Sequence, residues 1–169
     1  MDWKISQITK PEAATRQLNQ AIRLHFSGGD MLAVHTLAAA SLQLLVDLGK
    51  LAGVESRYRS QELIRPGRRK EVLAILNSTQ NYLKHADRDP EECHTYAEEG
   101  TVLLLSEVVE LASRLGLGNR REHLAFQLWF AAAFPDLINP PALAALQAVG
   151  SYDLDPRDRS LWAAWLAEA

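Results

Sequence analysis

The segment that most constrains this chain is a run of 16 residues, Met31 to Val46, without a charged side chain. Asp30 precedes the run as a potential helix N-cap, and Gly53 follows it at a position suited to a helix end. The run is shorter than the ~20 residues that usually span a membrane. A helix that is apolar on nearly every side is normally surrounded by other helices. We therefore predict a central helix over about residues 31–51, buried inside a bundle.

The remaining chain repeatedly shows residues that begin and end helices. Thr9 and Glu12 have the spacing of a capping box, and glycine or proline separates most of the later apolar segments. Apolar residues recur at helical spacing, and no segment alternates as a strand does. The sequence predicts an all-α bundle of six to seven helices, over about residues 9–27, 31–51, 68–86, 95–115, 119–134 and 140–149, with a seventh opening at Asp155-Pro156.

Length and composition indicate a single soluble domain. The chain has 169 residues, of which 47% are hydrophobic and 23% are charged. A net charge of −3 gives no general attraction to nucleic acid or anionic lipid, and we expect neither a DNA-binding motif nor a membrane partner. A single cysteine and an N-terminus without a basic and apolar leader favour a cytoplasmic protein.

Polar side chains gather at the end of the predicted third helix. On a helical wheel, Asn77, Asn81 and His85 fall opposite the core stripe, and Lys84 lies at the edge of that face. The predicted core stripe consists of Val72, Leu76, Thr79, Leu83 and Ala86. A histidine there could move a proton during phosphodiester cleavage, while an amide orients the phosphate. The candidate ligand-binding residues are Asn77, Asn81, Lys84, His85, Asp87 and Arg88, and the candidate catalytic residues are His85 and Asn81.

Two segments carry a family resemblance, Ala33 to Ala40 and Asn81 to Asp87. Over residues 11–116 the chain resembles small uncharacterised bacterial helical proteins with an Asn-x-x-Lys-His-x-Asp core. More distantly it is similar to the HEPN superfamily, helical nucleotide-binding and ribonuclease domains that often pair as dimers. In that superfamily an arginine precedes the histidine, and here Gln80 stands in its place. A neutral amide cannot pair with phosphate as a guanidinium does.

The resemblance implies a domain organisation and a function. Residues 1–118 would form a HEPN-like helical core, and residues 119–169 would form a helical extension packed on it. The expected function is a homodimeric binding module for nucleotide, RNA or a partner protein, without a cofactor. The alternative is a metal-independent ribonuclease in which His85 is the general acid and base and Asn81 orients the phosphate. Arg88, or an arginine from residues 57–69, would then supply the missing cation.

Two further interpretations remain open. A metal site could use His35, His85 and Asp87, with Asp89, His94 and Glu99 as further ligands, although no two of these have metal-ligand spacing on one helix.

The second interpretation is purely structural. Lys84 and His85 would complement the helix dipole, Asp87 would form the following turn, and the asparagines would face solvent. We expect the basic segment 53–69 to be a solvated surface or to pair with the acidic residues 87–99, with phosphate binding as the alternative. We expect His25 and His123 at helix surfaces.

Overall fold

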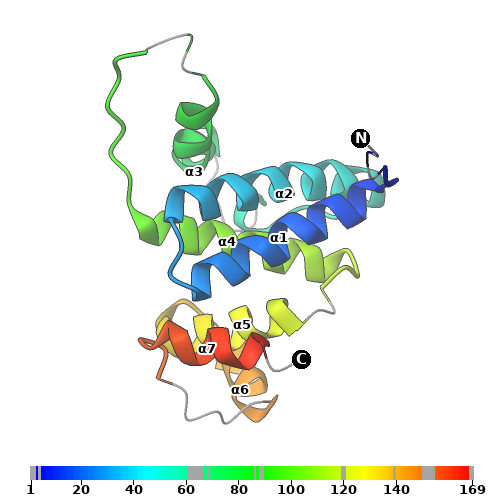
Figure 1. Cartoon of the computed structure of the whole chain (residues 1–169), viewed down its shortest axis with the longest axis vertical. Coiled ribbons are helices and arrows are strands. Elements are labelled where there is room, and N and C mark those ends of the chain that lie inside the picture. The colour runs from blue at the N-terminus through cyan, green and yellow to red at the C-terminus, as the bar shows by residue number, and fades with distance from the viewer. Residues whose placement is uncertain are drawn as a thin grey trace.

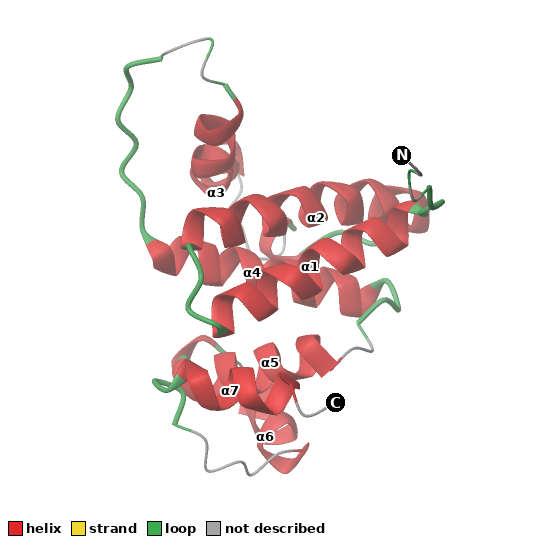
Figure 2. Ribbon diagram, in the orientation of Figure 1, coloured by secondary structure: helices red, strands yellow, loops and turns green. Residues whose placement is uncertain are grey.

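The structure is a computed structural model that describes residues 3, 5–60, 67, 69–85, 87, 90–118, 121–138, 140–149 and 155–167. Within these residues the chain forms α-helices and two short 3-10 turns, and no strand is present there (Figure 2). The all-α prediction is confirmed. The elements are α1 (Lys10–Phe26), α2 (Met31–Ala52), η1 (Arg57–Arg59), α3 (Arg69–Lys84), α4 (Glu98–Arg114), α5 (Arg121–Ala133), η2 (Pro135–Leu137), α6 (Pro140–Val149) and α7 (Arg159–Ala167).

The central helix is α2, as the charge-free run predicts. It packs against α1 and α4, and α3 stands on its outer side (Figure 1). Val34, Ala38, Leu42 and Leu45 are buried at helical spacing along its inward face. Ser41 is buried among them and donates a hydrogen bond of 2.9 Å to the carbonyl oxygen of Ala14 on α1, so the polar atom is satisfied where the two helices meet.

The charge-free run is shorter than a membrane span, but it is only part of the helix predicted over about residues 31–51. The helix continues past the charge-free run to Ala52, and it has 22 residues. In the described part of the chain, α2 is the one helix that is long and apolar enough to cross a membrane by length and composition alone. The core helix of a bundle meets the same criteria, and α2 has its inward face in the core.

Local capping sets several helix boundaries. At the start of α1, Thr9 N donates to Glu12 Oε2 at 2.8 Å and Glu12 N donates to Thr9 Oγ1 at 3.3 Å, which is the predicted capping box. The prediction for the last helix is wrong by about three residues. The Asp155 carboxylate accepts a hydrogen bond from Arg157 N within a turn, and the Asp158 carboxylate accepts one from Ser160 N. The helix α7 therefore begins only at Arg159.

The C-terminal helices share the core of the N-terminal ones. α5 and α7 pack on the side of α1 opposite α3, and α6 packs on α5 (Figure 1). Phe26 of α1 stacks on Trp162 of α7 with ring centroids 5.9 Å apart, and it meets Trp129 of α5 edge-on at 5.8 Å. These three aromatic rings join residues that lie more than 100 positions apart in the chain into one apolar cluster.

The expected surface positions of His25 and His123 are wrong. Both side chains are completely buried, and His25 of α1 lies against Phe126 and Trp129 of α5. Helical periodicity placed them near the edge of an apolar stripe. The packing of α5 against α1 covers that edge.

Candidate functional site

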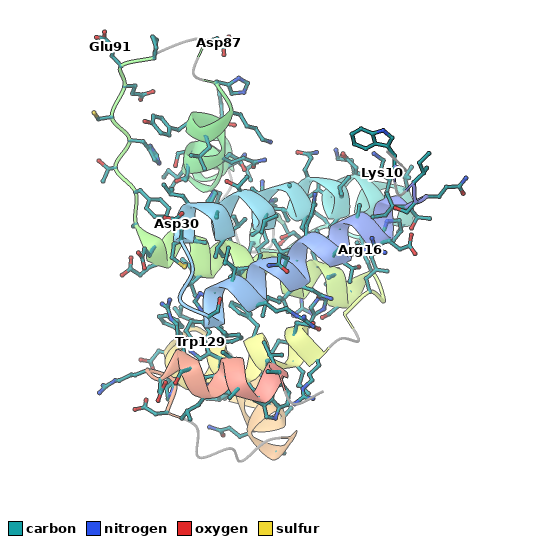
Figure 3. The ribbon with its side chains drawn as sticks, viewed as in Figure 1. Lys10, Arg16, Asp30, Asp87, Glu91 and Trp129 are labelled. Atoms are coloured by element: carbon teal, nitrogen blue, oxygen red, sulfur yellow. The ribbon has the colours of Figure 1, made fainter. Side chains whose placement is uncertain are left out.

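The predicted polar cluster lies at the outer end of α3. Asp87 and Glu91 mark the tip of the molecule farthest from α5–α7 (Figure 3). Asn81, Lys84 and His85 are all exposed at this end. The structure therefore brings the last turn of α3 and the start of the following segment together as one accessible polar surface.

Hydrogen bonds hold the segment after α3 against the helix. Thr79 Oγ1 and His94 Nε2 lie 2.9 Å apart, and Tyr82 Oη donates to the carbonyl oxygen of Glu92 at 3.0 Å. The rings of Tyr82 and His94 stack with centroids 5.0 Å apart and planes inclined by 20°. These contacts fix residues 92–94 beside α3.

The exposed imidazole has an acidic neighbour. Nδ1 of His85 lies 4.0 Å from Oδ1 of Asp87, so the carboxylate can influence the orientation of the ring. Among the predicted site residues, these two are brought close together. Asn81 lies one helical turn before His85 on the exposed side. Arg88, which we predicted as a ligand-binding residue and as a source of the missing cation, lies outside the described residues, as does Asp89.

Asn77 differs from the other predicted site residues. The wheel placed it on the outer face with Asn81, but its side chain is partly buried and its Oδ1 accepts a hydrogen bond of 3.1 Å from Arg59 Nη1. Conversely, Leu83 of the predicted core stripe is exposed. Arg59 draws Asn77 inward, and α3 is rotated relative to the apolar stripe that the sequence suggested.

Arg59 belongs to a buried network that the sequence analysis missed. Its Nε lies 2.5 Å from Oε1 of Glu107, and Ser56 Oγ donates to the same oxygen at 2.8 Å. Glu107 is only 2% exposed, in the middle of the inward face of α4. The sequence does contain a trace of this site, because Ser106-Glu107 interrupts the apolar run from Val102 to Val109. A carboxylate at such a position needs a cation.

The basic segment pairs with α4, and the expectation of a partner among residues 87–99 is wrong for its described arginines. Arg59 contacts Glu107, and Arg57 Nε lies 3.5 Å from Glu110 Oε1. Both glutamates are on α4, which runs directly beside η1. Arg65 and Arg68 lie outside the described residues.

His35 occupies a different environment from His85. It is buried, and its Nδ1 lies 3.0 Å from Oγ1 of Thr101 on α4. The same Thr101 Oγ1 lies 2.8 Å from Tyr96 Oη. Burial lowers the pKa of His35, and the nearby His94 lowers it further. Its Nε2 makes no hydrogen bond to the described residues. A neutral imidazole in the core is the state that this surrounding favours.

The metal interpretation gains no support from the part of the chain that the structure describes. No three His, Cys, Asp or Glu side chains gather there in a group that could hold a metal ion. His35 has hydroxyl partners inside the bundle, whereas His85 has Asp87 at the surface. The structure thus gives the two histidines of the predicted metal site different partners.

Large apolar side chains are also uncovered on α3. Ile75 is 66% exposed, and Tyr82 and Leu83 are exposed as well. Because exposed residues of this size on one helix mark interaction surfaces more often than a scattered single residue does, α3 is the strongest candidate contact element.

Comparisons of the chain with protein-family models, with curated proteins and with solved structures yield no match.

Proposed function

We propose that this protein is a HEPN-like helical binding module that pairs with a second copy of itself through α3. The observation that carries this proposal is the exposure of Ile75, Tyr82 and Leu83 on a helix whose other side is held to the bundle by Asn77. Burying such side chains in an interface stabilises association by about 25 cal/mol per Å² of apolar surface removed from water.

The charges at the end of α3 favour a second copy as the partner. Lys84 and His85 lie at this end together with Asp87, Glu91 and Glu92, all of them exposed. A two-fold axis places the same patch of both copies in contact, so the basic side chains of one can face the acidic side chains of the other. The resemblance to HEPN domains also implies a homodimer.

Size-exclusion chromatography with multi-angle light scattering tests this proposal. We expect the wild-type protein to elute as a dimer and Ile75→Glu to elute as a monomer with unchanged helical circular dichroism. Leu51→Glu is the matched control, because Leu51 is 88% exposed on α2, outside α3. Its dimer should persist. A wild-type protein that stays monomeric at high concentration, or a dimer that survives Ile75→Glu, would contradict the proposal.

A second candidate function is RNA cleavage, and the proximity of His85 to Asp87 favours it. The carboxylate of Asp87 lies 4.0 Å from Nδ1 and can orient the ring, as the carboxylate partner of a general acid–base histidine does. His85 would be the general acid and base, and Asn81 would orient the phosphate. The cation that this chemistry needs is missing at Gln80.

An RNA-cleavage assay decides between the binding module and the ribonuclease. If His85 is catalytic, His85→Ala should lose at least 100-fold in cleavage rate, which is the order of magnitude that general acid–base catalysis contributes. Equal background cleavage by the wild type and by His85→Ala would rule out the ribonuclease and leave the binding module untouched.

A further inference from the structure

A second site lies beside α4, away from the residues of α3. A cavity of about 570 Å³ opens between η1, α4, α5 and α6, which is within the size range of small-molecule sites. Its lining includes a charged part and an apolar part, and the uncharged polar residues Tyr58, Ser106, Ser113 and Gln127 complete it. Arg57, Glu110 and Arg114 form a charged wall, and the apolar wall consists of Val109, Phe126, Phe130, Leu137, Ile138 and Leu146.

Glu110 lies beneath the two arginines of the charged wall. Its Oε1 is 3.5 Å from Arg57 Nε and 3.8 Å from Arg114 Nε, and both carboxylate oxygens are shielded from solvent. Burial raises the pKa of Glu110, while the Arg57 backbone amide and the two guanidiniums act in the opposite direction. A carboxylate in this position holds both guanidiniums at the cavity.

The geometry leaves the terminal nitrogens of Arg57 available. Arg57 approaches Glu110 through Nε, and its two terminal nitrogens have no hydrogen bond to the described residues. Arg114 Nη1, by contrast, donates to the carbonyl oxygen of Glu55. Two guanidiniums beside one carboxylate also leave an excess of one positive charge at this wall. A paired set of guanidinium donors is the arrangement that binds a carboxylate in two-point fashion.

We propose that this cavity binds a small amphipathic carboxylate, with its anionic group on Arg57 and its apolar part against Phe130, Ile138 and Leu146. The positive excess selects one negative charge, and the apolar wall selects a hydrocarbon or aromatic body. This site lies on other elements than the contact face of α3 and goes beyond the proposed function. Its test does not depend on dimer formation.

Decanoate is a suitable probe, and isothermal titration calorimetry below its micelle concentration measures the binding. We expect one saturable site in the wild-type protein. Arg57→Gln should weaken decanoate binding at least tenfold, since it removes the charged donors. Arg16→Gln is the matched control, because Arg16 is an exposed arginine of α1 that does not line the cavity (Figure 3). It should bind decanoate like the wild type.

Two more measurements separate the anionic contact from unspecific apolar binding. Decyl maltoside has the same chain with a neutral head, and it should bind at least tenfold more weakly than decanoate. Leu137→Asp places a carboxylate at the exposed mouth of the cavity, where Leu137 is 62% exposed, and should weaken decanoate binding while preserving the fold. The absence of saturable decanoate binding, equal binding of the two probes, or equal affinities of wild type, Arg57→Gln and Leu137→Asp would each overturn the proposal.

Discussion

The guanidinium of Arg59 and the carboxylate of Glu107 form a buried ion pair, with Nε 2.5 Å from Oε1 and 3.3 Å between Nη2 and Oε2. The pair joins η1 to α4, and the same arginine reaches Asn77 on α3. It therefore links the position of α3 to the core of the bundle. Arg59 is 14% exposed and Glu107 is 2% exposed at the side chain, so neither charge is hydrated well enough to tolerate the loss of its partner.

Arg59→Ala is expected to lower the free energy of unfolding by about 3–5 kcal/mol, because it leaves the carboxylate of Glu107 buried without its cation. Urea denaturation followed by circular dichroism measures the loss. Arg57→Ala is the control, since the Arg57 side chain is largely exposed and its ion pair should contribute within about 1 kcal/mol. The double variant Arg59→Met, Glu107→Leu should recover much of the loss. Equal effects of Arg59→Ala and Arg57→Ala would contradict a special role for the buried pair.

Acid is expected to destabilise the protein through His25. Its ring lies 4.6 Å from that of Trp129, and neither ring nitrogen makes a hydrogen bond to the described residues. Burial lowers the pKa of His25 to about 3, and Arg159 adds to the effect. Between pH 6.5 and about 3 the unfolded chain therefore binds a proton that the folded chain does not, so stability falls as pH falls through this window.

The variant His25→Leu isolates this contribution. The difference in unfolding free energy between wild type and variant should change by up to about 1.4 kcal/mol per pH unit below pH 6.5, with the wild type losing more. Urea titrations at several pH values from 7 to 4 measure the difference. Parallel curves for the two proteins would show that His25 does not titrate in the predicted way.

Any side chain at Gly49 is expected to lower the stability of the protein. Its carbonyl oxygen accepts from Val54 N at 2.8 Å as the chain leaves α2, and a Cβ at Gly49 would stand 2.4 Å from the carbonyl oxygen of Val54. The backbone must shift to relieve this contact, so Gly49→Ala should cost about 1–3 kcal/mol.

Gly100→Ala provides the matched control for Gly49→Ala. Gly100 lies in the first turn of α4, and a Cβ there meets nothing within 4 Å. The substitution should stabilise the protein by about 0.4–1 kcal/mol, because alanine restricts the unfolded chain. Thermal unfolding of both variants checks the opposite signs. A loss of stability in Gly100→Ala similar to that in Gly49→Ala would argue against the close approach at Val54.

Compared with the wild type, the Glu110→Gln variant is expected to have a more favourable free energy of unfolding at neutral pH than at acidic pH. The raised pKa of Glu110 means that the folded state holds its proton more tightly than the unfolded state does. The wild type therefore loses stability as pH rises from the ordinary carboxyl pKa through the higher folded value, and the glutamine variant lacks this loss. Urea titrations at pH 4 and pH 7 measure the difference. A variant that becomes relatively worse toward pH 7 would contradict the raised pKa.

The sequence by itself determined the helices and much of the core. Capping at Thr9 and the charge-free run that became α2 are local patterns, and local patterns decide where a helix begins and which residues repeat on one face. The exposure of Asn81, Lys84 and His85 followed from the same periodicity. The positions of these side chains are thus consistent with the site that the sequence suggested, while the ligand of that site remains a proposal.

Only the tertiary structure decided which distant residues meet. It buried His25 beneath α5, turned Asn77 toward Arg59, and joined the basic segment to Glu107 and Glu110. These contacts depend on which helices pack against one another. A buried charge pairs with the opposite charge that this packing brings near it. Helical spacing contains no information on that choice, because it relates residues within one helix and not residues on two helices.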